Sequence, residues 1–199
     1  FTENALWLSE NDTETDTLNR INEFTDNLPP RHSKQTLPTE DQHQAIQRIY
    51  KVGFGHRKRP LVLSADRGRG KTAVLGLAAI DLLTKGKQHI VLTASRYDQA
   101  NTAFEQACLL LKRDFSDCRI LTNKTGLLTF ECQNQTKVFE FMAPDQLILQ
   151  PTLADVLMVD EAAHLPTPLL TELLRRHHRM VFATTLHGYE GSGRGFELR

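Results

Sequence analysis

A short apolar run that leads through a glycine-rich basic turn into a helix constrains the fold more than any other feature of the sequence. The stretch is "LVLSADRGRGKTAVLGLAAI", residues 61–80. It fits the phosphate-binding pattern of Gly, four residues and Gly-Lys-Ser/Thr after a strand, except that Ala65 stands where the first glycine is expected. Alanine adds only a methyl group, so we expect it to be tolerated if the backbone there keeps ordinary dihedral angles. The stretch therefore predicts a nucleotide-binding loop in an α/β protein.

Further apolar runs alternate with helical segments along the rest of the chain. Continuous apolar runs are typical of strands buried on both faces, and their alternation with helices predicts a mostly parallel sheet with helices on both faces. Thr39 and Gln42 fit a capping box at the start of a helix that precedes the loop. The runs assigned to strands are "HIVLTAS", "RILT", "DVLMVDEA", "RMVFATT" and the two halves of "LLTFECQNQTKVFEFM".

Each residue type in the loop suits one part of a nucleoside triphosphate. Gly68 and Gly70 let the backbone approach the phosphates closely, and the helix start favours the anion. Lys71 is expected to reach the β- and γ-phosphates as a catalytic residue, and the Thr72 hydroxyl to bind Mg²⁺. The predicted nucleotide contacts in the loop are Asp66, Arg67, Gly68, Arg69, Gly70, Lys71, Thr72 and Ala73.

Two acidic residues follow another buried run, in "LMVDEAAHLP". The carboxyl ends of parallel strands meet at one edge of a sheet, so Asp160 and Glu161 are expected beside the loop. Asp160 is predicted to bind Mg²⁺, and Glu161 to orient or deprotonate the attacking water. His164, on the loop that follows, either couples the nucleotide state to another part of the protein or has no role, and the second is the expectation for an exposed loop histidine.

Two more side chains are predicted to contact the nucleotide. An amide can pair with the donor and acceptor edge of adenine, which suggests Gln42. Arg194 lies among four glycines in "TTLHGYEGSGRGF", and its guanidinium could fork onto a γ-phosphate.

Composition limits the partners and the compartment. The 24 basic and 24 acidic residues balance, so any nucleic-acid contact must be local. Six arginines could supply such local charge or simply be solvated: Arg67, Arg69, Arg96, Arg175, Arg176 and Arg179. Cys108, Cys118 and Cys132 form no CxxC pair, so we expect buried thiols in a cytoplasmic protein, without a disulfide or a zinc site. No apolar run is long enough for a membrane helix, so no membrane partner is expected.

These motifs in this order resemble the ATPase core of helicases, and together they are similar to the bacterial tRNA(Met) cytidine acetyltransferase family. "TEDQHQAI", "SADRGRGKT", "VLTASRYDQA" and "VDEAAHLP" carry the likeness to helicases, and "TTLHGYEGSGRGF" carries the likeness to the acetyltransferases. The resemblance implies a RecA-like lobe that uses ATP or GTP with Mg²⁺. It also implies, for the whole protein, acetyl-CoA-dependent N4-acetylation of the wobble cytidine of elongator tRNA(Met).

The resemblance covers residues 37–199, which we expect to form the ATPase lobe of a longer protein. Residues 1–36 are polar and acidic and are expected to be a linker or a loosely docked arm. The acetyl-CoA site and the second lobe would lie in other domains of the same chain. Two alternatives stay open: the first ATPase lobe of an unrelated helicase or P-loop ATPase, and a nucleotide-gated RNA-docking module without turnover.

Overall fold

The computed structural model describes residues 38–56, 58–150 and 152–185. The predicted arm over residues 1–36 and the predicted contact Arg194 lie outside the described residues. The helices are α2 (Glu40–Phe54), α3 (Lys71–Thr84), α4 (Tyr97–Asp114), α5 (Pro144–Leu149) and α6 (Thr167–Arg176), with a 3₁₀ turn η1 (Ala162–His164). The strands are β1 (Leu61–Ser64), β2 (His89–Thr93), β3 (Arg119–Lys124), β4 (Leu127–Cys132), β5 (Gln135–Phe141), β6 (Val156–Val159) and β7 (Met180–Thr184).

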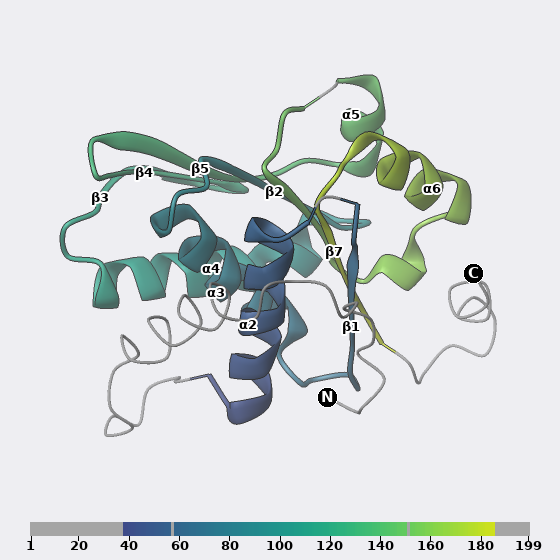
Figure 1. Ribbon diagram of the computed structural model, residues 1–199, viewed down its shortest axis with the longest axis horizontal. Helices are drawn as coiled ribbons and strands as arrows, with labels where there is room; N and C mark the ends of the chain where they lie inside the picture. Colours follow the sequence, from purple (N-terminus) through teal and green to yellow (C-terminus); the bar gives the residue numbers. More distant parts are fainter. Residues whose placement is uncertain (1–37, 57, 151, 186–199) are drawn as a thin grey trace.

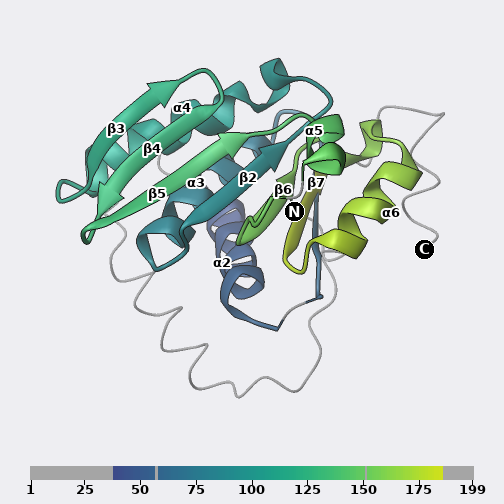
Figure 2. The same cartoon turned by 90° about the horizontal axis from the view of Figure 1, so that it is seen from above.

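The strands form one seven-stranded sheet in the order β1-β7-β6-β2-β5-β4-β3. The five strands from β1 to β5 in that order pair in parallel, while β4 runs antiparallel to both of its neighbours. Figure 1 shows β1 and β7 side by side, and Figure 2 shows the β3–β4–β5 meander extending the sheet on the other side. The predicted α/β fold with a mostly parallel sheet is therefore confirmed.

Helices cover both faces of the sheet, as predicted. Adjacent strand residues alternate between two apolar clusters, since successive side chains of a strand point to opposite faces. Ile90 packs in the cluster beneath α2, α3 and α4, whereas Val91 packs in the cluster beneath α5 and α6. Val181 and Phe182 divide in the same way. Figure 2 shows the two groups of helices on opposite sides of the sheet.

Helix α3 is the most deeply buried helix of the described chain, which agrees with its apolar sequence. Gly76 faces α4 at very short range: a Cβ built there would lie 2.0 Å from the backbone oxygen of Ala103. Only a residue without a side chain allows α3 and α4 to pack at this distance. This contact holds α3, and therefore the turn at its start, against the rest of the core.

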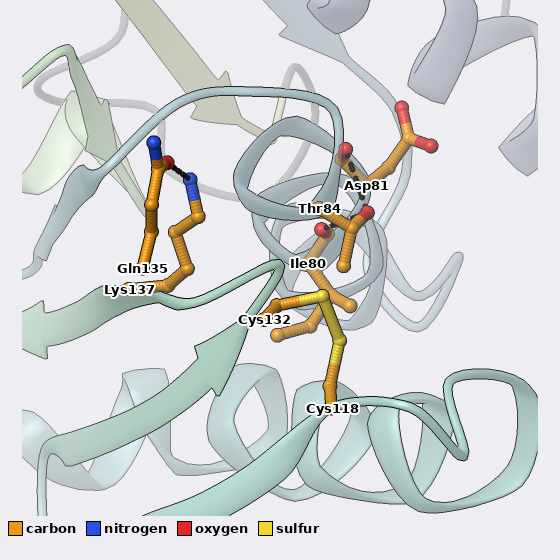
Figure 3. The surroundings of a disulfide bond; sticks show 7 residues. All are labelled: Ile80, Asp81, Thr84, Cys118, Cys132, Gln135 and Lys137. Carbon is orange, nitrogen blue, oxygen red and sulfur yellow. Dashed lines mark hydrogen bonds between the residues drawn. A yellow bond between two sulfur atoms is a disulfide. The ribbon is translucent and has the colours of Figure 1, made fainter.

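The structure corrects the prediction for the cysteines. Cys118 and Cys132 form a disulfide, with Cα atoms 4.5 Å apart, and Cys108 is a buried free cysteine. The pairing of β3 with β4 explains the bond, because Arg119 is opposite Glu131 and the next pair outward is Cys118 with Cys132. Figure 3 shows the disulfide near Ile80, Asp81 and Thr84 of α3. Counting cysteines could not reveal this bond, since it depends on strand register.

Smaller differences concern helix boundaries. The capping box of Thr39 and Gln42 is present at the start of α2. Helix α6 begins at Thr167, with Pro166 as N-cap, whereas the pair Thr167-Pro168 in the sequence predicts an N-cap at Thr167 and a helix that starts at Pro168. The sequence did not indicate α5, whose six residues are too few to show a helical period. No helix within the described ranges is both long and apolar enough to cross a membrane.

Candidate nucleotide site

The turn between β1 and α3 lies at the carboxyl edge of the sheet. Gly68 has φ +83° and Gly70, the N-cap of α3, has φ +73°, a region that side chains disfavour. The described non-glycine residues with positive φ are Lys58, Gln133, Asn134 and Glu161. Ala65 is not one of them. Ala65 is buried, and its N–H donates to the Thr184 oxygen of β7 at 3.3 Å. The missing first glycine therefore leaves the loop backbone unstrained.

Lys71 is the first residue of α3 and is only 5% exposed. Its Nζ donates to the backbone oxygens of Ala65 at 2.9 Å and Asp66 at 3.1 Å, so the side chain folds back over the turn. No side chain caps the start of α3, and its first turn carries no acidic residue. The first backbone N–H groups of the helix and the ammonium together form a positive site suited to an anion.

Asp160 directly follows β6 and is completely buried. Its N–H donates to the Thr93 oxygen of β2 at 2.8 Å, and its Oδ2 accepts from the Thr72 hydroxyl at 2.5 Å. Burial raises the pKa of Asp160, while the hydrogen bond from Thr72 opposes that rise. Keeping this buried carboxylate charged costs free energy, and a cation beside it would offset that cost.

Glu161 is held in the left-handed region, with φ 47° and ψ 49°. Its N–H donates to Asp160 Oδ1 at 3.0 Å. The Thr185 hydroxyl lies 3.3 Å from Glu161 Oε2 and 3.5 Å from Oε1. A non-glycine residue in this conformation is strained, and such strain is concentrated at functional sites. The bent backbone directs the Glu161 carboxylate toward the end of β7.

Gln42 comes to the loop from α2, 27 residues earlier in the chain than its contact. Its Nε2 donates to the Arg69 oxygen at 3.5 Å, and its Oε1 accepts from the Thr39 N–H at 3.0 Å. A Cβ at Gly70 would lie 2.4 Å from Gln42 Nε2. The absence of a side chain at Gly70 gives the flexible Gln42 amide room for this approach, and the positive φ of Gly70 favours glycine independently.

The structure brings most of the predicted site residues to one edge of the sheet. Asp66, Arg67 and Arg69 lie in the turn, and Ala73 lies in the first turn of α3. Thr185 is a contact of Glu161 that the sequence did not single out; its position after a neighbouring strand is the signal that could have found it. The residues gathered there are Gln42, Asp66, Arg67, Gly68, Arg69, Gly70, Lys71, Thr72, Ala73, Asp160 and Glu161.

The oxygen atoms of Thr72 and Asp160 suit Mg²⁺ better than they suit a metal ion whose ligands all come from the protein. The described residues contain no group of three or more His, Cys, Asp or Glu that could hold a metal ion. Mg²⁺ commonly takes one or two protein oxygens and completes its shell with water and phosphate. Thr72 and Asp160, already in contact, are such a pair.

A separate pocket of about 720 Å³ lies near the end of α3 and beside the disulfide. Leu77, Asp81, Phe115, Cys118 and Cys132 are among its lining residues, and none of the predicted nucleotide contacts is. It therefore plays no part in the site at the carboxyl edge.

Residues 62–199 match the family described as RNA cytidine acetyltransferase NAT10/TcmA, helicase domain. The chain is 45% identical over 172 residues to the tRNA(Met) cytidine acetyltransferase TmcA of Nitrosococcus halophilus, covering 86% of this chain and 21% of that protein. It is 43% identical over 175 residues to the Vibrio cholerae protein of the same name, covering 88% of this chain and 23% of that protein. The chain thus spans about a fifth of the length of these relatives.

The fold also resembles that of solved ATPase domains. A mutant of the large terminase ATPase domain of a Thermus phage superposes with a TM-score of 0.56 at 20% identity. The superposition covers 85% of this chain and 71% of that chain. At this identity the likeness supports the fold alone, which is that of RecA-like ATPase domains.

Proposed function

The chain belongs to the family of helicase domains of the NAT10/TcmA RNA cytidine acetyltransferases, and on this basis we propose that it binds and hydrolyses ATP. ATP hydrolysis would serve the N4-acetylation of the wobble cytidine of elongator tRNA(Met) by the whole protein. GTP fits the same phosphate contacts. The observation that carries this proposal is the meeting of Lys71, Thr72, Asp160 and Glu161, from two segments far apart in the chain, at one edge of the sheet.

The proposed roles follow from the contacts of each side chain. Lys71 would exchange its two carbonyl partners for the β- and γ-phosphates, since an ammonium binds a phosphate oxygen more strongly than a neutral carbonyl. Backbone N–H groups of the turn, with Gly68 and Gly70 providing the close approach, would surround the phosphates. Gln42 would bind the base, and Arg194 the γ-phosphate.

Thr72 and Asp160 would hold Mg²⁺. The ion neutralises charge on the phosphate oxygens when it is bound. Glu161 would act on the water that attacks the γ-phosphate, and its constrained backbone would fix the direction of its carboxylate.

For the whole protein we propose a cytoplasmic tRNA-modifying enzyme. Residues 37–199 would be its RecA-like ATPase lobe and residues 1–36 the linker before it. Acetyl-CoA would bind a domain outside this chain, and the tRNA would contact this lobe and the acetyltransferase domain together. The family match over residues 62–199 and the greater length of the relatives support an ATPase lobe within a longer protein.

Glu161→Gln tests hydrolysis separately from binding. The substitution keeps the size of the side chain and removes its basicity, so we expect phosphate release to fall about 100-fold or more while Mg²⁺-ATP affinity changes little. Glu131→Gln, which removes an exposed carboxylate paired with Arg119 on the far side of the sheet, is the matched control. If wild-type protein with tRNA present binds ATP but releases no phosphate, the chain is instead a nucleotide-gated docking module.

A further inference from the structure

The six arginines that could bind nucleic acid do not form one surface. Arg67 and Arg69 follow β1 and Arg96 follows β2, so these three lie at the carboxyl edge with the nucleotide site. Arg175, Arg176 and Arg179 precede β7 and therefore lie at the opposite, amino edge. Figure 1 shows β1 and β7 running side by side between these two edges.

A second basic segment meets the one before β7. Lys58 and Arg59 lie just before β1, which pairs in parallel with β7. The Lys58 N–H donates to the His178 oxygen at 2.7 Å, and Arg179 Nη2 donates to the Gly55 oxygen at 3.2 Å. Two segments more than 100 residues apart in the chain are thus joined by two hydrogen bonds. The donor of one is the Lys58 backbone, and the donor of the other is the Arg179 side chain. We call Lys58, Arg59, Arg175, Arg176 and Arg179 the amino-edge basic surface.

Little of the charge on this surface is neutralised. Within the described part of the chain, no ion pair joins Lys58, Arg59 or Arg179 to a carboxylate. Glu172 alone pairs with both Arg175 and Arg176, at 2.8 and 2.6 Å. Arg59 Nη1 and Arg179 Nε are buried and have no hydrogen-bond partner among the described residues.

The nearby groups do not cancel this excess. Asp155 lies at the same edge, before β6, but its Oδ2 accepts the N–H groups of Gln88 and His89, and within the described residues it forms no ion pair with the five cations. Burial, together with Arg176 and His178, lowers the pKa of His177, which disfavours the charged form of this imidazole. The positive charge therefore comes from one lysine and four arginines, which keep it at any physiological pH.

We propose that the amino-edge basic surface binds the phosphate backbone of RNA. The proposal rests on the proposed function, and it assigns the RNA to the edge opposite the nucleotide site. Arginine forks match phosphate oxygens in pairs, and several cations gathered at one edge of the sheet suit a polymer that carries a charge on every nucleotide. An RNA held there leaves the carboxyl edge open to ATP.

Equilibrium binding of labelled elongator tRNA(Met) to the chain, from 50 to 300 mM NaCl, tests this surface. The variant Lys58→Asn/Arg175→Gln removes two exposed cations, and asparagine tolerates the positive φ of 66° at position 58. We expect roughly tenfold weaker binding at 100 mM salt, and a salt slope shallower by about 0.7–0.9 for each lost contact. The control Lys112→Gln/Lys124→Gln removes the same charge from exposed positions on α4 and β3 and is expected to leave affinity unchanged.

Measuring Mg²⁺-ATP binding by the same proteins separates a failure of this inference from a failure of the proposed function. If both double variants weaken tRNA binding equally, net charge alone determines the affinity, and that result would overturn the inference. So would unchanged tRNA affinity in the amino-edge variant, or equally effective competition by poly-glutamate, which would indicate an acidic protein partner. In each of these cases intact ATP binding leaves the nucleotide site in place; loss of ATP binding in wild-type protein would instead refute the proposed function.

Discussion

Ala65 leaves the backbone of the phosphate loop unstrained, while a left-handed backbone and the Thr185 hydroxyl fix the direction of Glu161. The spacing of Gly68, Gly70, Lys71 and Thr72 predicts a phosphate loop because all of its contacts are local. The ordinary backbone at Ala65 agrees with the condition set for tolerating alanine there. The left-handed conformation of Glu161 and its contact with Thr185 depend on which strands lie next to each other, and no local pattern encodes that.

Thr185→Val should slow hydrolysis without weakening nucleotide binding. Valine keeps the shape of threonine but cannot donate to Glu161, so the carboxylate loses one constraint on its direction. A hydrogen bond to a charged group contributes about 1.5 kcal/mol, which corresponds to roughly a tenfold lower kcat. Steady-state kinetics should show that loss with KM little changed and with recovery in Thr185→Ser. A raised KM at constant kcat would mean that Thr185 contacts the nucleotide rather than Glu161.

At the scale of elements, α3 links the nucleotide site to the core. Its nearly continuous apolar sequence agrees with the deep burial of the helix in the structure. Its contact with α4 through Gly76 was not predictable, because a glycine within a helix can equally be a weak point of that helix. The short helix α5 likewise had no periodicity to detect.

Gly76→Ala should destabilise the fold. Alanine favours a helix by about 1 kcal/mol over glycine, but the new methyl would meet the rigid Ala103 backbone. The cost of overpacking, about 1–3 kcal/mol or more, should exceed this gain in helix propensity and lower the Tm by several degrees. Gly53→Ala is the control, because the nearest atom there belongs to the flexible Leu82 side chain. Equal melting temperatures for the two variants would contradict close α3–α4 packing.

Asp81, near the end of α3, should make stability depend on pH. Burial raises its pKa to about 6, despite an opposing ion pair with Lys85. Because the folded pKa exceeds the unfolded one, the folded state gains relative stability as pH falls from above 6 to below 4. Asp81→Asn should therefore raise the free energy of unfolding at pH 8 by about 2 kcal/mol, and the gain should shrink toward pH 4. Denaturant titrations at several pH values measure it, and a gain independent of pH would contradict the assignment.

At the scale of the whole molecule, alternating strands and helices predict the layers but not the strand order. After β1 the chain forms β2, β3, β4 and β5, and only later inserts β6 and β7 between β1 and β2. That insertion sets Asp160 and Thr185 beside the loop, and the same order joins the two basic segments at the other edge. The disulfide of Cys118 and Cys132 also follows from strand register, which is why residue counting missed it.

The proposed function requires that the loop beginning at Ala65 binds the phosphates of a nucleotide. Calorimetric titration of the chain with Mg²⁺-ATP, beside Lys71→Ala and Ala65→Gly, measures this binding. We predict saturable binding by wild-type protein, similar affinity in Ala65→Gly, and a loss on the order of 100-fold in Lys71→Ala, since a charge-assisted contact contributes about 3 kcal/mol. Binding that Lys71→Ala leaves intact, or that appears only in Ala65→Gly, would contradict it.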